Sequence, residues 1–380
     1  MEKKLKVANI GMKFGMCHVE GAMKYSGAEI AALCDCNEEN LRFAGERYGI
    51  PEEKWVTDYM DIVNNPDIDV VTVAIPDQQH VKVSCDLLRA GKHVLCEKPL
   101  ALTREDIEEM VRVADESGAK FMVGQICRFT PAFEKAKEII ESGTLGELYF
   151  VESEYAHDYV NVFAKRGGNW RCDPQRNGVV GGGCHAVDLL RWIAGNPVET
   201  TAYSNHKVLT DWPVDDTTIA IFRFPNQVIG KVFTSIGCKR NYTMRTVLYG
   251  TRGTIIVNNT DPVLDLYQLQ ENGSSALTQL PLEINNHNVQ AEHEIHSVHG
   301  EHQRSGEDLH PRRYSSGDYR RRRSPDSYGL PCCSTVCQNR CTGTDCVSRL
   351  RFALKTVLTE YARHAIIYWY RCLYRHILYR

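Results

Sequence analysis

The sequence predicts an α/β fold with two domains: an N-terminal doubly wound parallel sheet, followed by an α+β domain with a mainly antiparallel open sheet. Strand-like and helix-like segments alternate up to about residue 125, and longer strands follow one helix up to about residue 295. After that point the composition changes abruptly. We therefore divide the chain into residues 1–125, residues 126–295 and a tail at 296–380.

Short apolar runs mark the strands of the first domain. They are residues 6–10, 29–34, 69–75, 92–96 and 120–124. The run at 69–75 is rich in β-branched residues, which is typical of a strand buried on both faces. Strands that alternate with helical segments form parallel βαβ units.

A helix over residues 131–142 opens the second domain. Alternating segments then predict strands at 148–155, 217–224, 228–236, 246–249 and 254–257. Turn residues separate these segments, as in an antiparallel meander.

Composition narrows the class of protein. The chain is 43% hydrophobic and 24% charged, as expected for a soluble globular protein, and its net charge of −3 argues against a nucleic-acid partner. No signal peptide and no membrane span are predicted, because no apolar segment of the required length occurs. The cysteines before residue 295 mostly stand alone in apolar runs, which favours a reducing cytoplasm.

A glycine-containing turn follows the first strand. Gly11 and Gly15, with Lys13 and Phe14 between them, would let the backbone approach a diphosphate at a helix N-terminus. The turn is one residue shorter than GxGxxG, and an ordinary βα turn is the alternative. Asp35 ends the second strand, where a carboxylate would accept a ribose hydroxyl and favour NAD over NADP; the alternative role is a helix N-cap.

Further candidates follow two central strands. Pro76 and His80 come after the strand at 69–75, and Glu97 and Lys98 come after the strand at 92–96. All four would line the crevice in which open parallel sheets bind ligands. Burial lowers the pKa of a lysine towards neutrality, although a Glu-Lys pair is also common on solvated surfaces.

Several segments in order resemble the glucose–fructose oxidoreductase / inositol dehydrogenase (Gfo/Idh/MocA) family over residues 5–295. They are residues 91–100 (GKHVLCEKPL), 128–131 (RFTP), 142–147 (SGTLGE), 181–192 (GGGCHAVDLLRW) and 250–255 (GTRGTI). The resemblance implies a Rossmann domain, an open-sheet domain and a substrate between them. It also implies an NAD(P)-dependent dehydrogenase that moves a hydride between a nicotinamide and a secondary alcohol of a sugar, inositol or related polyol.

The resemblance also implies roles for two residues. Lys98 would contact the reacting hydroxyl and His185 would be its acid/base. A lone histidine on an apolar helix is otherwise a core residue, but the glycines before it allow close approach of a ligand. Many members carry an aspartate where this chain has Gly181, so either Asp158 or Asp188 substitutes for it or the proton relay is simpler.

A polar and aromatic cluster supplies the substrate-binding candidates. They are His157, Asp158, Tyr159, Trp170, Arg171 and Asp188. Aromatic rings with hydrogen-bonding partners suit a sugar, and an arginine suits an acidic or phosphorylated substrate; a structured surface loop is the alternative. No metal site is predicted, and the open sheet face predicts a homodimer or homotetramer.

Two other functions remain open at this point. An NAD-dependent glycoside hydrolase of the same fold would release sugar without net NADH. A non-catalytic regulator would bind NAD and a sugar, although the presence of both Lys98 and His185 counts against it.

The tail at 296–380 has one lysine against fourteen arginines and no apolar periodicity over most of its length. Read one nucleotide later, permitted codons for residues 329–346 can spell VCRAVAQSARTGAPVQI, which resembles the family's C-terminal helix and strand. We favour a frameshift over a zinc site, because the cysteines lack paired spacing, and over a disordered native tail. Sequencing the coding DNA around residues 288–300 tests this interpretation.

Overall fold

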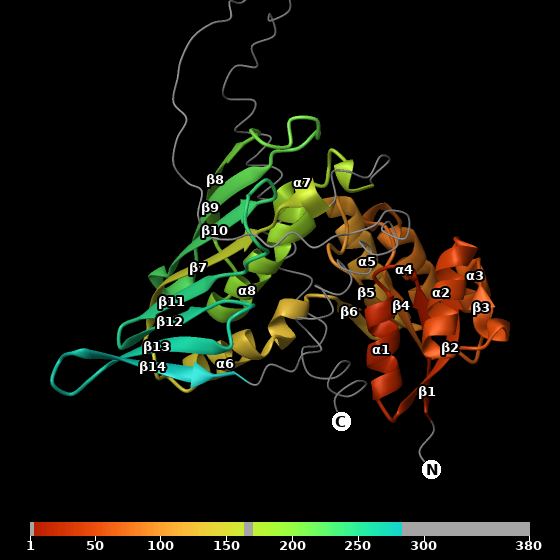
Figure 1. Cartoon of the computed structure of the whole chain (residues 1–380), viewed down its shortest axis with the longest axis horizontal. Coiled ribbons are helices and arrows are strands. Elements are labelled where there is room, and N and C mark those ends of the chain that lie inside the picture. The colour runs from red at the N-terminus through yellow and green to blue at the C-terminus, as the bar shows by residue number, and fades with distance from the viewer. Residues whose placement is uncertain (1–3, 163–169, 283–380) are drawn as a thin grey trace, which may run out of the picture.

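The computed structural model describes residues 4–162 and 170–282, which form two domains side by side (Figure 1). The first domain carries a six-stranded sheet in the order β3-β2-β1-β4-β5-β6, and all its neighbouring strands are parallel. Its strands are β1 (Leu5–Ile10), β2 (Ala28–Cys34), β3 (Trp55–Val56), β4 (Val70–Val73), β5 (His93–Cys96) and β6 (Phe121–Val123). The order reverses between β1 and β4, the point at which such sheets bind ligands.

Helices connect these strands. They are α1 (Met16–Lys24), α2 (Glu38–Tyr48), α3 (Tyr59–Asn64), α4 (His80–Arg89) and α5 (Arg104–Ser117), with short 3₁₀ turns η1 (Glu52–Lys54) and η2 (Asp77–Gln79). Local signals define their ends: the Asn37 side chain accepts hydrogen bonds from two amides of α2, and Thr103 caps α5. Such caps contribute about 1 kcal/mol each.

The second domain is built on an eight-stranded sheet in the order β14-β13-β12-β11-β7-β10-β9-β8. Its strands are β7 (Leu148–Ala156), β8 (Glu199–Asn205), β9 (Thr217–Arg223), β10 (Ile229–Ser235), β11 (Thr246–Gly250), β12 (Gly253–Val257), β13 (Val263–Leu269) and β14 (Ser275–Pro281). Strand β10 pairs with β7 in parallel, and the other pairs are antiparallel. The predicted fold class is confirmed.

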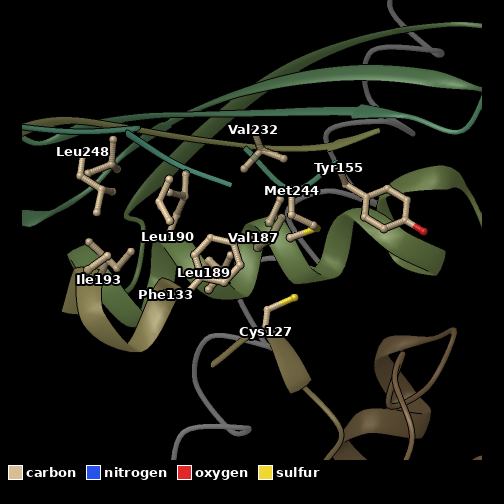
Figure 2. Packing of buried hydrophobic residues seen from close by; sticks show 14 of the residues in the cluster. Cys127, Phe133, Tyr155, Val187, Leu189, Leu190, Ile193, Val232, Met244 and Leu248 are labelled. Carbon is tan, nitrogen blue, oxygen red and sulfur yellow. The ribbon is translucent and has the colours of Figure 1, made fainter. Parts of the chain in front are cut away.

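One face of this second sheet is covered by helices (Figure 1). The segments outside the sheet are η3 (Ile126–Phe129), α6 (Pro131–Glu141), α7 (Tyr159–Val162), η4 (Trp170–Cys172), the π-helix η5 (Val179–Gly183), α8 (Cys184–Ala194) and η6 (Pro225–Gln227). Phe133 of α6 and Leu189 and Leu190 of α8 pack between the helices and strand residues such as Val232 and Leu248 (Figure 2). This core fixes α8, and with it His185, against the sheet.

Within residues 4–162 and 170–282, no helix covers the opposite face of the sheet. Residues of β9 alternate between buried and exposed, so that Ile219 and Ile221 point away from the helices. Tyr203 of β8, which pairs with Ile219, is 77% exposed.

Several sequence interpretations fall on residues outside the described ranges. The frameshift, zinc and native-tail alternatives concern residues 296–380, and the predicted boundary at 295 also lies there. Within the described ranges, no helix combines the length and apolar character needed to cross a membrane.

Candidate functional site

The glycine turn after β1 brings the backbone close to the end of β4. Gly11 has φ +91°, and a Cβ on it would lie 2.3 Å from the Ala74 carbonyl oxygen. A Cβ on Gly15 would lie 2.0 Å from the carbonyl oxygen of Gly11. Only glycine fits at both positions, and α1 begins directly after them with the positive end of its dipole at the turn. The turn therefore fits a diphosphate.

The side chains of this turn differ in exposure. Lys13 is exposed, whereas Phe14 is half-buried and meets the ring of His18 edge-on. Lys13 therefore carries an exposed positive charge in the turn.

Asp35 lies beside the turn at the end of β2. Its Oδ2 accepts the amide of Met12 at 2.7 Å, and its Oδ1 accepts the amide of Asn37 at 2.9 Å. The N-cap of α2 is Asn37, so Asp35 does not fill the alternative role of helix cap. Its carboxylate is partly exposed, which leaves a negative charge where a ribose hydroxyl would be held.

Glu97 ties the segment after β5 to α1. Its Oε1 lies 2.9 Å from Nε2 of the buried His18, and its Oε2 accepts the amide of Lys98 at 3.1 Å. Burial of Glu97 opposes ionisation, but the hydrogen bond and charge of His18 and the charge of Lys98 outweigh it and lower the pKa of Glu97. The carboxylate therefore positions the Lys98 backbone.

His80 has the same positioning character. It is fully buried, with Nδ1 2.9 Å from the Pro99 carbonyl and Nε2 3.0 Å from the Ile75 carbonyl. Burial alone would lower its pKa, but Cys96, Asp77 and the Pro99 carbonyl raise it to about 10. A doubly protonated ring can donate to both carbonyls and join the segments after β4 and β5. Pro76, half-buried, precedes η2 in the first of these segments.

His185 is the buried group that these segments face. It lies in the first turn of α8 and is 1% exposed, and neither ring nitrogen has a hydrogen-bond partner among the described residues. Burial, followed by the charge of Lys98, lowers its pKa well below the usual value. The ring is therefore neutral at pH 7, with a nitrogen lone pair available close to the Lys98 ammonium.

Three glycines before His185 allow other elements to approach this end of α8. A Cβ on Gly182 would lie 2.2 Å from the ring of Tyr155, and one on Gly183 would lie 2.3 Å from Thr234 Oγ1. A Cβ on Gly181 would lie 2.3 Å from Nη1 of Arg176. The glycine run is thus required by packing within a π-helix, a local distortion that often marks functional sites.

Sequence reasoning missed Arg176 and its partner Asp77. Arg176 Nε donates to Asp77 Oδ2 at 2.5 Å, and its Nη2 donates to the Gly181 carbonyl at 3.2 Å. Both side chains are buried, and the pair joins η2 of the first domain to the second domain. The sequence signal that could have indicated Arg176 is Gly181, because a glycine close to a functional histidine leaves room for the side chain of another residue.

The predicted substrate-binding residues separate into two groups. The Tyr155 hydroxyl joins His157 Nδ1 at 3.1 Å and the Tyr159 hydroxyl at 3.2 Å. The Arg171 and Arg176 guanidinium groups lie 4.2 and 5.0 Å from the centre of the Trp170 ring.

The two predicted aspartates face basic partners. Asp158 lies 3.4 Å from Lys239. Asp188 is buried and receives two hydrogen bonds of 2.5 Å from Arg128, which ties α8 to η3. Asp188 is therefore placed to hold the helix rather than to relay a proton.

Comparisons with known proteins agree with this geometry. A model described as "Oxidoreductase family, NAD-binding Rossmann fold" matches residues 5–125, and one described as "GFO/IDH/MocA C-terminal domain" matches residues 133–256. Myo-inositol 2-dehydrogenase of Thermotoga maritima is 27% identical over 267 residues, covering 67% of this chain and 75% of that protein. 1,5-Anhydro-D-fructose reductase of Ensifer adhaerens is 29% identical over 297 residues, covering 76% and 87%.

Solved structures share the fold. Levoglucosan dehydrogenase in complex with NADH and L-sorbose superposes with a TM-score of 0.67 at 22% identity, over 78% of this chain and 90% of that one. Because one family model matches each of the two described domains, the predicted family and cofactor class are confirmed. The chain belongs to the GFO/IDH/MocA family and is an oxidoreductase whose first domain binds NAD.

Proposed function

We propose that the chain oxidises a secondary alcohol of a sugar, inositol or related polyol, reversibly, with NAD as the hydride acceptor. The observation that carries this proposal is the buried, neutral His185 ring, which has no hydrogen-bond partner among the residues that the structure describes and lies close to the Lys98 ammonium. The names of the relatives, which include myo-inositol 2-dehydrogenase and levoglucosan dehydrogenase, support the substrate class.

The residues divide the work of alcohol oxidation. The Lys98 ammonium donates a hydrogen bond to the substrate oxygen and stabilises the negative charge that develops on it. A ring nitrogen of His185 accepts the hydroxyl proton as the hydride leaves the carbon. NAD, when bound, accepts that hydride, and in the reverse direction His185 returns the proton.

Other residues hold the cofactor and the geometry. Gly11 and Gly15, together with the first turn of α1, would hold the diphosphate, and Lys13 and Phe14 lie in the same turn. Asp35 and Pro76 would line the rest of the cofactor site. Glu97 and His80 act indirectly, because each fixes the segment that carries Lys98.

A substrate panel with a matched variant tests the proposal. NADH fluorescence would be followed with sugars and polyols for the wild type, His185→Asn and the control His206→Gln. His206 contacts the Leu209 carbonyl in a loop of the second domain. Loss of the base should lower kcat by roughly 10²- to 10⁴-fold while the NADH Kd changes little, and the control should behave as the wild type.

Three outcomes would overturn the proposal. If His185→Asn turned over substrate as fast as the wild type, His185 would not be the base. Release of free sugar from an aryl glycoside without net NADH would identify the glycoside hydrolase instead. Binding of NAD and sugar with no turnover of any kind would identify a regulator.

We also propose a cytoplasmic homodimer or homotetramer. The open face of the second sheet exposes Tyr203, Ile219 and Ile221, an apolar surface that a second copy would cover. The described ranges contain nine cysteines, all of them free thiols, as expected in a reducing compartment. Light scattering after size-exclusion chromatography tests the assembly, and Tyr203→Glu should dissociate it.

A further inference from the structure

We propose that Gln125 binds a second hydroxyl group of the substrate, close to the one that is oxidised, and so helps to determine which polyols react; this inference rests on the proposed function. Gln125 lies two residues after β6 and is the N-cap residue of η3. None of the roles described above requires its side chain.

The side-chain amide of Gln125 is buried without a hydrogen-bond partner. The residue is 8% exposed, and neither Nε2 nor Oε1 has a partner among the described residues. Within residues 4–162 and 170–282, His185 is the other residue with two such atoms. A buried polar group without a partner destabilises the free protein, whereas a ligand that supplies the partner removes this penalty. The amide therefore suits a ligand group that both donates and accepts, as a hydroxyl does.

Gln125 lies beside Lys98 at the carboxyl edge of the first sheet. Strands β5 and β6 pair in register up to their last residues, and the amide of Gly124 donates to the Cys96 carbonyl at 2.8 Å. A Cβ on Gly124 would lie 2.9 Å from Oε1 of Glu97, so the two chains stay adjacent beyond the ends of the strands. Lys98 and Gln125 are the next residues along these chains. Neighbouring strands are about 5 Å apart, a distance that a single polyol molecule spans.

Gln125 is also connected to the helix that carries His185. Its carbonyl accepts the amide of Arg128 at 3.3 Å within η3. The Arg128 guanidinium donates two hydrogen bonds of 2.5 Å to Asp188, which lies three residues after His185 on α8. Residues three apart lie on the same face of a helix. The segment from Gln125 to Arg128 therefore joins the Lys98 edge of the sheet to the face of α8 that carries His185.

The strand order favours the substrate over the cofactor as the ligand of this amide. The diphosphate turn follows β1, whereas Lys98 follows β5 and Gln125 follows β6. In the order β1-β4-β5-β6, Gln125 is therefore farther from the diphosphate turn than Lys98 is. A dinucleotide bound at the switch point between β1 and β4 approaches Lys98 from the other side. The carboxamide of the nicotinamide is the alternative ligand, and the experiment distinguishes it.

The experiment compares polyols with analogues that lack one hydroxyl group. The parent compounds are D-glucose, D-galactose and myo-inositol, and NMR of each product identifies the carbon that is oxidised. The analogues are the monodeoxy derivatives that keep this reacting hydroxyl, and each is assayed for NADH formation. In the wild type, removal of the hydroxyl that pairs with Gln125 should lower kcat/KM by roughly 10- to 100-fold, because the amide is then left unpaired.

The variant Gln125→Leu assigns the effect to this side chain. Leucine has a similar volume but forms no hydrogen bond, so the parent-to-deoxy ratio of kcat/KM should approach one. The Tm of the unliganded variant should equal or exceed that of the wild type, because two unpaired buried atoms are removed. The control Gln270→Leu changes an exposed glutamine in the turn between β13 and β14, whose Nε2 donates to the Gln268 carbonyl, and should leave the ratio unchanged.

The outcomes separate this inference from the proposed function. If a parent compound is oxidised but no deoxy position gives a ratio that depends on Gln125, the substrate contact is wrong and the dehydrogenase remains. A Tm for Gln125→Leu several degrees below that of the wild type would show a structural glutamine and have the same consequence.

The cofactor alternative has its own signature. If Gln125→Leu bound NADH more weakly and lost activity equally on parent and deoxy compounds, the amide would contact the nicotinamide and the inference would be overturned. If NAD binds but no parent compound is oxidised, the proposed function fails and this inference fails with it.

Discussion

Replacing Gly181 with alanine tests the packing around Arg176 most directly. The added Cβ would lie 2.3 Å from Nη1 and 2.7 Å from Cζ of the guanidinium. A long side chain normally moves aside at little cost, but this one is held by Asp77 at 2.5 Å and by the Gly181 carbonyl. We therefore expect overpacking to cost about 1–3 kcal/mol in the free energy of unfolding. If the guanidinium were expelled, Asp77 would lose its buried partner and the cost would rise to about 3–5 kcal/mol.

A second glycine gives a matched control. A Cβ on Gly178, three residues earlier, would make ordinary contacts of 3.4–3.5 Å with Ile236 and Thr234. Both substitutions change backbone entropy in the same direction, so their difference isolates the clash. With a difference of about 2 kcal/mol, Gly181→Ala should melt roughly 4–8 °C below Gly178→Ala.

The assay is thermal and urea unfolding of both variants and of Gly181→Ala/Arg176→Ala. With Arg176→Ala measured as well, the cost of adding the alanine at position 181 should be smaller in the Arg176→Ala background than in the wild type, so that the two changes are non-additive. If Gly181→Ala matched Gly178→Ala within about 0.5 kcal/mol, the guanidinium would not occupy the space beside this glycine.

Three further substitutions probe the cofactor side of the site. Asp35→Asn removes a charge but keeps the shape of the side chain. The Kd for NADPH divided by the Kd for NADH, both measured by fluorescence titration, should therefore fall by about 10-fold. An unchanged ratio would show that Asp35 does not set the preference for NAD. Gly11→Ala should weaken NADH binding strongly. The control Gly91→Ala is also at positive φ, but nothing lies within 4 Å of its added Cβ, so it should cause only local backbone strain. Equal NADH Kd values for the two variants would refute the close approach of the cofactor to the Gly11 turn. The pKa of His80 is raised to about 10 in the folded state, so its contribution to the free energy of unfolding is complete below pH 6.5 and is lost as pH rises towards 10. In urea titrations, His80→Gln should therefore lower the free energy of unfolding by a few kcal/mol at pH 6 and by much less at pH 10. A loss of stability that does not depend on pH would contradict the protonated ring.

Buried parallel strands could be predicted because their apolar runs are continuous. The segments at 6–10, 69–75 and 92–96 correspond to β1, β4 and β5, and the residues that follow them face the switch point of the sheet. Strands at the edges of the second sheet were missed. Strand β8 (Glu199–Asn205) has no buried residue, and in β14 (Ser275–Pro281) exposed residues predominate, so neither has a clear apolar face.

The part of the site that could not be predicted depends on contacts between residues that are far apart in the sequence. Asp77 and Arg176 are 99 positions apart, and Arg128 and Asp188 are 60 apart. No local pattern shows that Asp188 is held by an arginine or that a second arginine fills the space at Gly181. The candidates that follow strands, such as Glu97, lie at the strand ends that residue order predicted, whereas their hydrogen-bond partners depend on tertiary packing.

The ion pair between Asp77 and Arg176 constrains how the enzyme can move. It spans the two domains next to the nicotinamide-binding sheet, and Gln78 adds a second tie to the Trp170 carbonyl at 3.0 Å. Swinging the domains apart would break this charge-assisted pair and the Gln78 hydrogen bond, and water would have to solvate both charged groups in their place. We therefore expect the pair to favour the domain arrangement described above, so that opening of the two domains requires both ties to break together.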